Sequence, residues 1–181
     1  MPENAKPPAK LVDFYYGSSA IGISRSQTNN AEINFIFDEE QYGKIGENQY
    51  LIVWMDLTNV EFRKASFGVL TSGTAASPYR TDDKDKAYPA FYYLADGSQE
   101  WTTLNHGGDG CFGAGDNCAM LGKKGYFAFN LSDMQNGSNK LSADSLITGI
   151  YIYLDIQNNN YANVEFYIDD IKLVADYTSI N

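Results

Sequence analysis

The residues from Gln49 to Leu57 read Gln-Tyr-Leu-Ile-Val-Trp-Met-Asp-Leu, and this stretch decides the fold class. Side chains on an extended strand point alternately to its two faces. One face of such a strand carries an unbroken apolar stripe, formed by Leu51, Val53, Met55 and Leu57. The other face mixes aromatic, apolar and acidic side chains, namely Tyr50, Ile52, Trp54 and Asp56. The stretch therefore predicts a strand with one side in a core.

Similar short runs rich in Ile, Val, Phe and Tyr recur from Leu11 onward, separated by clusters of Asn, Gly, Ser and Asp. This spacing is typical of an all-β sandwich or barrel, and we expect an all-β fold of the β-sandwich type. Only Ser132 to Gln135 suggests a brief helical turn. The expected strands are Leu11 to Tyr16, Glu32 to Phe37, Gln49 to Leu57, Ser66 to Thr71, Ala87 to Leu94, Gln99 to Leu104, Gly125 to Leu131, Thr148 to Ile156 and Asn163 to Val174.

Length and composition favour one globular domain. The chain has 181 residues, of which 44% are hydrophobic and 20% are charged, which is enough apolar material for a full core. No apolar run approaches the roughly 20 residues that a membrane-spanning helix needs, so no membrane segment is expected. We expect residues 1–10 to be the remainder of a linker and residues 11–181 to form a single, monomeric domain of a larger protein.

The charge of the chain narrows the class of partner. The formal net charge is −10 and the pI is about 4.4, so no basic surface is expected that could displace counterions from nucleic acid. Anionic sugars and lipids are disfavoured for the same reason, unless a bound cation reverses the local field. A neutral partner fits best.

The only two cysteines, Cys111 and Cys118, bracket a glycine-rich loop. We predict that they form a local disulfide, which would place the protein in an oxidising, extracellular compartment. Two free, buried thiols are the alternative. A zinc site is disfavoured, because the chain has a single histidine, His106, to accompany them. The first ten residues have no apolar stretch and are not expected to be a signal peptide.

Three predicted strands share an unusual outer face, which mixes aromatic rings with carboxylates and amides where Thr, Lys, Glu and Ser would be ordinary. Such a face suits a sugar, because the C–H face of a pyranose stacks on an aromatic ring while its hydroxyls need polar partners. Alternatively, these rings pack under loops or cover a second core. The predicted ligand-binding residues are Trp54, Tyr126, Tyr151 and Tyr153 for stacking, with Asp56, Asn130 and Asp155 for the hydroxyls, and Trp101 beside a long loop in reserve.

The stretch Phe166-Tyr-Ile-Asp-Asp-Ile-Lys-Leu-Val174 resembles the closing strand of a known family. This family comprises the calcium-containing jelly-roll carbohydrate-binding modules of bacterial plant-cell-wall hydrolases, within the galactose-binding-like group. Ile147 to Asp155 and Gly125 to Leu131 resemble the strands that precede it. The resemblance implies a jelly roll with a structural calcium between the first and last strands, held by Asp169 and, as its candidate partner, Asp13. A strand-end turn or a solvated edge is the alternative for the pair Asp169–Asp170.

Two other classes of function could use the same side chains. A glycoside hydrolase needs two carboxylates facing each other, and Asp56 and Asp155 could form a pair, but no catalytic motif surrounds them or Glu165. We therefore do not expect an enzyme. A surface or adhesion domain could instead use the aromatic face to dock protein. The favoured function is a noncatalytic module that binds a neutral plant-type polysaccharide such as β-glucan, xylan, mannan or xyloglucan.

Overall fold

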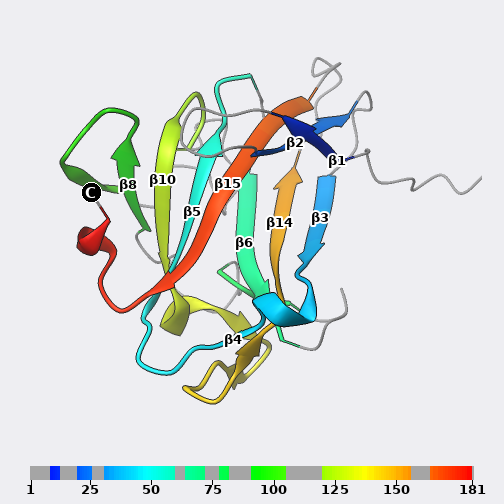
Figure 1. The fold of residues 1–181 in the computed structure, drawn as a ribbon, viewed down its shortest axis with the longest axis vertical. Coiled ribbons are helices and arrows are strands. Elements are labelled where there is room, and N and C mark those ends of the chain that lie inside the picture. Colours follow the sequence, from blue (N-terminus) through cyan, green and yellow to red (C-terminus); the bar gives the residue numbers. More distant parts are fainter. Residues whose placement is uncertain are drawn as a thin grey trace, which may run out of the picture.

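The computed structural model describes residues 9–12, 20–25, 31–59, 64–71, 78–81, 91–104, 120–155 and 164–180. In this part of the chain the strands are assembled into antiparallel sheets (Figure 1). The helical segments among these residues are short 3-10 turns, and none of them is long enough to cross a membrane. The turns are η1 (Glu39–Gln41), η2 (Leu131–Asp133) and η3 (Tyr177–Ser179).

Two large sheets and a small one contain the described strands. In spatial order, the seven-stranded sheet consists of β1 (Ala9–Val12), β2 (Ala20–Arg25), β15 (Val164–Val174), β5 (Tyr50–Asp56), β10 (Lys124–Asn130), β8 (Phe91–Ala95) and β9 (Trp101–Leu104). The six-stranded sheet consists of β12 (Asn139–Lys140), β11 (Gln135–Asn136), β7 (Tyr79–Arg80), β6 (Lys64–Leu70), β14 (Gly149–Asp155) and β3 (Ala31–Ile36). The small sheet pairs β13 (Leu146–Ile147) with β4 (Gly43–Lys44).

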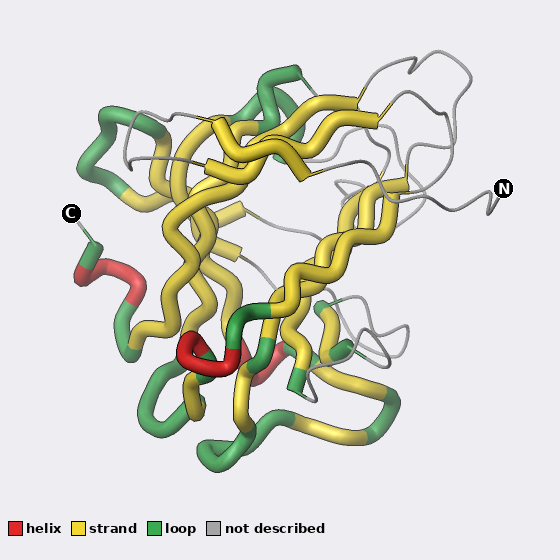
Figure 2. The backbone as a smooth tube through the Cα atoms, turned by 45° about the vertical axis from the view of Figure 1, so that its right-hand side comes forward, coloured by secondary structure: helices red, strands yellow, loops and turns green. Residues whose placement is uncertain are grey.

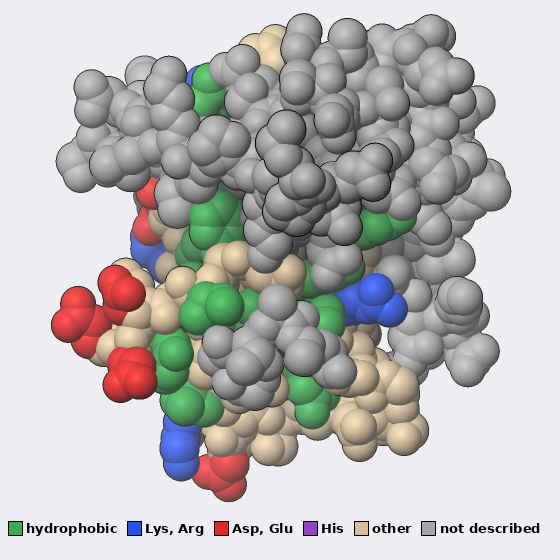
Figure 3. Space-filling view, turned by 90° about the vertical axis from the view of Figure 1, so that its right-hand side faces the viewer, with side chains coloured by type: hydrophobic (Ala, Val, Ile, Leu, Met, Phe, Trp, Pro, Cys, Tyr) green, Lys and Arg blue, Asp and Glu red, His purple; other side chains and the backbone are tan. Residues whose placement is uncertain are grey.

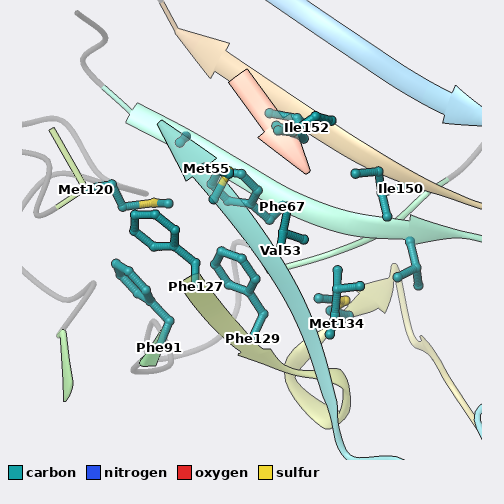
Figure 4. Packing of buried hydrophobic residues seen from close by; sticks show 14 of the residues in the cluster. Val53, Met55, Phe67, Phe91, Met120, Phe127, Phe129, Met134, Ile150 and Ile152 are labelled. Carbon is teal, nitrogen blue, oxygen red and sulfur yellow. The ribbon is translucent and has the colours of Figure 1, made fainter. Parts of the chain in front are cut away.

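The two large sheets pack face to face around one hydrophobic core (Figure 2). Val53 and Met55 from β5 and two phenylalanines from β10 point toward Ile150 and Ile152 of the opposite sheet (Figure 4). Phe129 of β10 stacks on Phe67 of β6 with the ring centroids 4.7 Å apart. This contact joins the layers, so the apolar stripes meet as they do in a β-sandwich.

The predicted all-β sandwich is confirmed, and so is the core stripe of β5, because its four residues are all buried in this cluster. The jelly-roll connectivity stays a prediction. The first two strands differ from expectation. β1 begins at Ala9, which pairs with Ile23, so the first sheet residue lies inside the segment expected to be a linker. β2 was not among the expected strands, and it lies between β1 and β15.

Candidate functional site

The outer face of the seven-stranded sheet brings together four of the predicted binding residues. Tyr126 of β10 lies directly opposite Trp54 of β5 in the strand register, and Asn130 lies opposite Tyr50. Asp56, at the other end of β5, lies opposite Lys124. Since these residues alternate with core residues along their strands, they all point away from the sandwich interior.

Trp54 is nevertheless not exposed. Its exposed fraction is 0%, so its ring is not open to a ligand at the surface. The physical reason is that the outer face is covered at this point. The Lys124 ammonium lies 5.7 Å from the centre of the Trp54 ring. The Tyr126 hydroxyl donates a 2.7 Å hydrogen bond to Asp170 of β15, across the strand that carries Trp54.

Polar contacts hold this cover in place. Lys124 Nζ lies 3.6 Å from an Asp56 carboxylate oxygen and 3.7 Å from one of Asp96. Asp56 also accepts hydrogen bonds from the backbone and the hydroxyl of Thr58. A sugar hydroxyl at Asp56 would therefore compete with Lys124 and Thr58 for the carboxylate oxygens. Asn130 is likewise engaged on one side, since its Oδ1 accepts a bond from the backbone N–H of Ser132 and begins η2.

The other predicted stacking residues lie on the opposite side of the molecule. Tyr151 and Tyr153 belong to β14 and point outward from the six-stranded sheet, so they do not share a surface with Trp54. Tyr151 is 2% exposed, with the Arg80 guanidinium carbon 5.8 Å from its ring centre, whereas Tyr153 is partly exposed. The backbone of Asp155 ends this same strand, which belongs to the other large sheet from the strand that carries Asp56.

A different cluster of aromatic side chains lies on the outer face of the seven-stranded sheet. We call this cluster the aromatic patch, and it consists of Tyr50, Tyr92, Trp101 and Tyr177, all of them partly exposed. Tyr92 and Tyr177 stack with ring centroids 4.1 Å apart and an interplanar angle of 14°. Tyr177 also meets Tyr50 and Trp101 edge-on, at 5.0 and 5.1 Å. The reserve prediction, Trp101, is thus the one predicted tryptophan that is partly exposed.

The register and the C-terminal turn assemble the aromatic patch. Tyr92 lies opposite Thr103 on β9, two residues beyond Trp101, and η3 brings Tyr177 back onto the sheet beside β8 (Figure 1). The Asp176 side chain accepts a bond from Thr178 N and caps this turn. Sequence reasoning missed Tyr177 because it follows the last strand, where strand periodicity no longer reports direction. Tyr92 lay within an expected strand, but its face was not assigned.

Burial is the main reason that two patch phenols resist ionisation. It raises the pKa of Tyr177 above its ordinary value of 10.0, with Tyr92 and Asp176 as further causes. Burial likewise raises the pKa of Tyr50, reinforced first by Tyr92 and then by Tyr177. Both rings are therefore neutral hydrogen-bonding groups near neutral pH. The Trp101 indole Nε1 is buried without a hydrogen-bond partner among the described residues.

The candidate calcium ligand Asp169 lies at a β-bulge in β15. Asp169 is paired with Trp54 of β5, but the next pairing is between Lys172 and Ile52, so β15 contains one extra residue here. Asp170 adopts a φ of 47° within the bulge, and its carboxylate is bound by Lys172 Nζ at 2.7 Å. Asp169 Oδ1 accepts a bond from Asp170 N, whereas its Oδ2 is buried without a hydrogen-bond partner in the described part of the chain.

Of the two predicted calcium ligands, only Asp169 lies in the described part of the chain. Asp13 lies outside the described residues, and so do Cys111 and Cys118 of the predicted disulfide. β2 lies between β1 and β15 in the sheet. The end of β1 is level with Ile168 of β15, because Val12 pairs with Ala20 of β2 and the adjacent Ile21 pairs with Ile168. Within the described ranges, no group of three or more His, Cys, Asp or Glu side chains is placed to hold a metal.

Comparison with known proteins adds no relative to this description. The chain matches no known family model, and no curated protein matches it either. The class that fold and site define is an all-β sandwich with an aromatic cluster on one outer sheet face.

Proposed function

We propose that this protein is a noncatalytic carbohydrate-binding domain of jelly-roll type, which recognises a neutral plant-type polysaccharide through the aromatic patch. The observation that carries the proposal is the clustering of Trp101 with three tyrosines on one sheet face, all partly exposed. The proposed site lies around Trp101, on the same sheet face as Trp54, whose ring is buried.

The chemistry of the aromatic patch suits a sugar ring. Planar rings stack on the C–H face of a pyranose, and they lose little side-chain entropy when they do so. The phenol groups of the three tyrosines can donate to or accept from the hydroxyls at the rim of the sugar. The net charge of −10 favours a neutral chain over an acidic one.

A protein partner is the alternative occupant of such a patch, and hydrophobic exposure argues against it. The exposed large hydrophobic side chains of the described residues are Ile36, at 50%, and Leu146, at 39%. Neither belongs to the patch, whose residues are all aromatic and mostly carry a hydroxyl. Figure 3 draws the other side of the molecule, which carries β3 and β14 and not the patch. Protein-docking surfaces more often have a continuous apolar centre.

The proposal also includes a bound calcium ion, a disulfide and an extracellular location. We include a structural calcium with Asp169 as a ligand, which fits the Oδ2 of that side chain, buried without a hydrogen-bond partner among the described residues. Asp13 is the second proposed ligand. We also include a disulfide between Cys111 and Cys118 and an extracellular location, in which the domain brings an attached enzyme or cell surface to the polysaccharide.

Affinity electrophoresis tests the proposed function. The protein is run through native gels that contain β-glucan, xylan, glucomannan or xyloglucan, with bovine serum albumin as the control for nonspecific retardation. We expect at least one of these polysaccharides to retard the protein in a concentration-dependent way. Unchanged mobility in all of them would contradict the proposal.

A further inference from the structure

A pocket of about 310 Å³ opens at the end of the sandwich where β5 begins and β10 ends. This is the end of the molecule that carries β4 (Figure 1). Its walls come from the segment that precedes β5, from the start of η2 and from the loop between β12 and β13. A volume at the lower end of the roughly 300–1,000 Å³ range of ligand pockets suits a small ligand.

The lining of this pocket is polar but uncharged. Three amide side chains contribute to it, Asn48, Gln49 and Asn130, together with the hydroxyl residues Ser132 and Ser142. The rest of the lining is apolar or backbone, and no lining residue carries a charge. A pocket of this kind offers no counterion to an ionic ligand. It can instead surround a neutral molecule that has hydroxyls on its rim and C–H groups on its faces.

Two of the amides have one half engaged, and the other half has no hydrogen-bond partner in the described part of the chain. Asn130 Oδ1 accepts from Ser132 N at 2.9 Å, so its Nδ2 group remains as a donor. Asn48 Nδ2 donates to the Ile45 carbonyl at 2.9 Å, so its Oδ1 remains as an acceptor. Since the backbone fixes both side chains, the free donor and the free acceptor have set positions. Groups fixed in advance in this way lower the entropic cost of binding a ligand.

The pocket adjoins the aromatic patch. Asn130 lies directly opposite Tyr50 in the register of β10 and β5, and Gln49 immediately precedes Tyr50. We infer that the pocket is a second subsite, which binds the terminal sugar unit of the chain whose body lies on the patch. This inference rests on the proposed function for the nature of the ligand, and it adds recognition of a chain end.

Nuclear magnetic resonance of the side-chain amides tests this inference. The ¹⁵N-labelled protein is titrated with cellobiose, xylobiose and mannobiose, which are short enough to enter the pocket. We expect the amide signals of Asn48, Gln49 and Asn130 to shift and saturate with at least one disaccharide. The Trp101 indole signal reports the patch separately.

Asn130→Asp is the decisive variant. Aspartate keeps the acceptor that begins η2 but removes the Nδ2 donor and adds a charge, so binding of the disaccharide should weaken about tenfold. Asn139→Asp, the same change on exposed β12, is the matched control and should leave the affinity unchanged. If Asn130→Asp does not fold, Gln49→Ala replaces it, because the Gln49 side chain is exposed, and it should weaken binding in the same way.

Two results would overturn the inference. One is that none of the disaccharides shifts the pocket amides. The other is that the amides shift but the pocket variant binds as tightly as the unchanged protein. A shift of the Trp101 indole without any shift of the pocket amides would refute the subsite and leave the proposed function standing.

Discussion

Trp54 and Trp101 are the two tryptophans of the chain, and they belong to the same sheet face but have different surroundings. Trp54 lies in a central strand, between Tyr126 and Asp169 in the register, and is completely buried. Trp101 lies on the edge strand β9 and is partly exposed. The alternation of side chains along a strand predicts which sheet face a residue belongs to. Its exposure depends instead on whether neighbouring side chains cover it.

Replacing Trp54 should therefore affect stability. Trp54→Ala removes a fully buried ring and should lower the free energy of unfolding by about 3–5 kcal/mol, because a cavity remains in its place. Urea denaturation measures this loss. Trp101→Ala is the matched control, and its cost should be clearly smaller because that ring is partly exposed. Equal costs for the two variants would mean that the covered position of Trp54 is wrong.

The tyrosines of the patch predict a pH dependence. Burial raises the pKa of Tyr50 and Tyr177 above 10.0, so the folded state holds these phenol protons more tightly than the unfolded chain does. Their contribution to stability is thus complete below the unfolded value and is lost as the pH rises through the raised folded values. Urea denaturation from about pH 8 to about pH 11 should show this decline, and Tyr177→Phe should reduce it. An identical decline in the variant would contradict this origin.

At the scale of elements, the bulge in β15 is the feature that the sequence did not reveal. Phe166 to Val174 alternates as one strand would, but β15 contains one extra residue here, and Asp170 makes polar contacts with both Asp169 and Lys172. Asp170 occupies the left-handed region that favours glycine, and its hydrogen bonds with Tyr126 and Lys172 hold it there. Sequence patterns report strand periodicity, whereas a bulge is set by the pairing with a neighbour.

Asp169, the predicted calcium ligand, lies at this bulge. If Asp169 ligates calcium only in the folded state, saturating calcium should raise the melting temperature and a chelator should lower it, by mass action. Differential scanning calorimetry with calcium and with EGTA measures the shift, with magnesium at equal concentration as the control for ionic strength. Asp169→Asn should abolish most of the calcium-dependent shift.

An unchanged melting curve after thorough chelation, together with elemental analysis that finds no metal, would refute the calcium site. A calcium shift of the same size in Asp169→Asn would place the ion elsewhere in the molecule.

At the scale of the whole molecule, the sequence predicted the sandwich because the core stripes of β5, β10 and β14 alternate cleanly, and these stripes do meet in the core. The sequence did not predict which of the outward-facing aromatic residues belong to which of the two large sheets. Trp54 and Tyr151 have the same pattern in their own strands, yet they lie on opposite sheets. Strand periodicity assigns a residue to a face, whereas the order of strands in the sheets depends on long-range contacts that no local pattern contains.

The predicted disulfide also belongs to this scale, because a disulfide would indicate an oxidising compartment for the whole protein. Closing a loop as short as the one between Cys111 and Cys118 contributes about 2.5 kcal/mol on the chain-entropy model. Intact mass after alkylation of the unreduced, denatured protein should show no added groups, and two groups should add after reduction. Two alkylated thiols without reductant would argue against secretion.

Calorimetric titration of a Trp101 variant shows whether polysaccharide binds at the aromatic patch. Trp101→Ala should bind the polysaccharide that most retards the unchanged protein about thirtyfold more weakly, with its melting temperature nearly unchanged, since one stacking ring contributes on the order of 2 kcal/mol. Tyr153→Ala, on the opposite sheet, should bind as the unchanged protein does. Undiminished binding by folded Trp101→Ala, or loss of binding in Tyr153→Ala instead, would contradict the account.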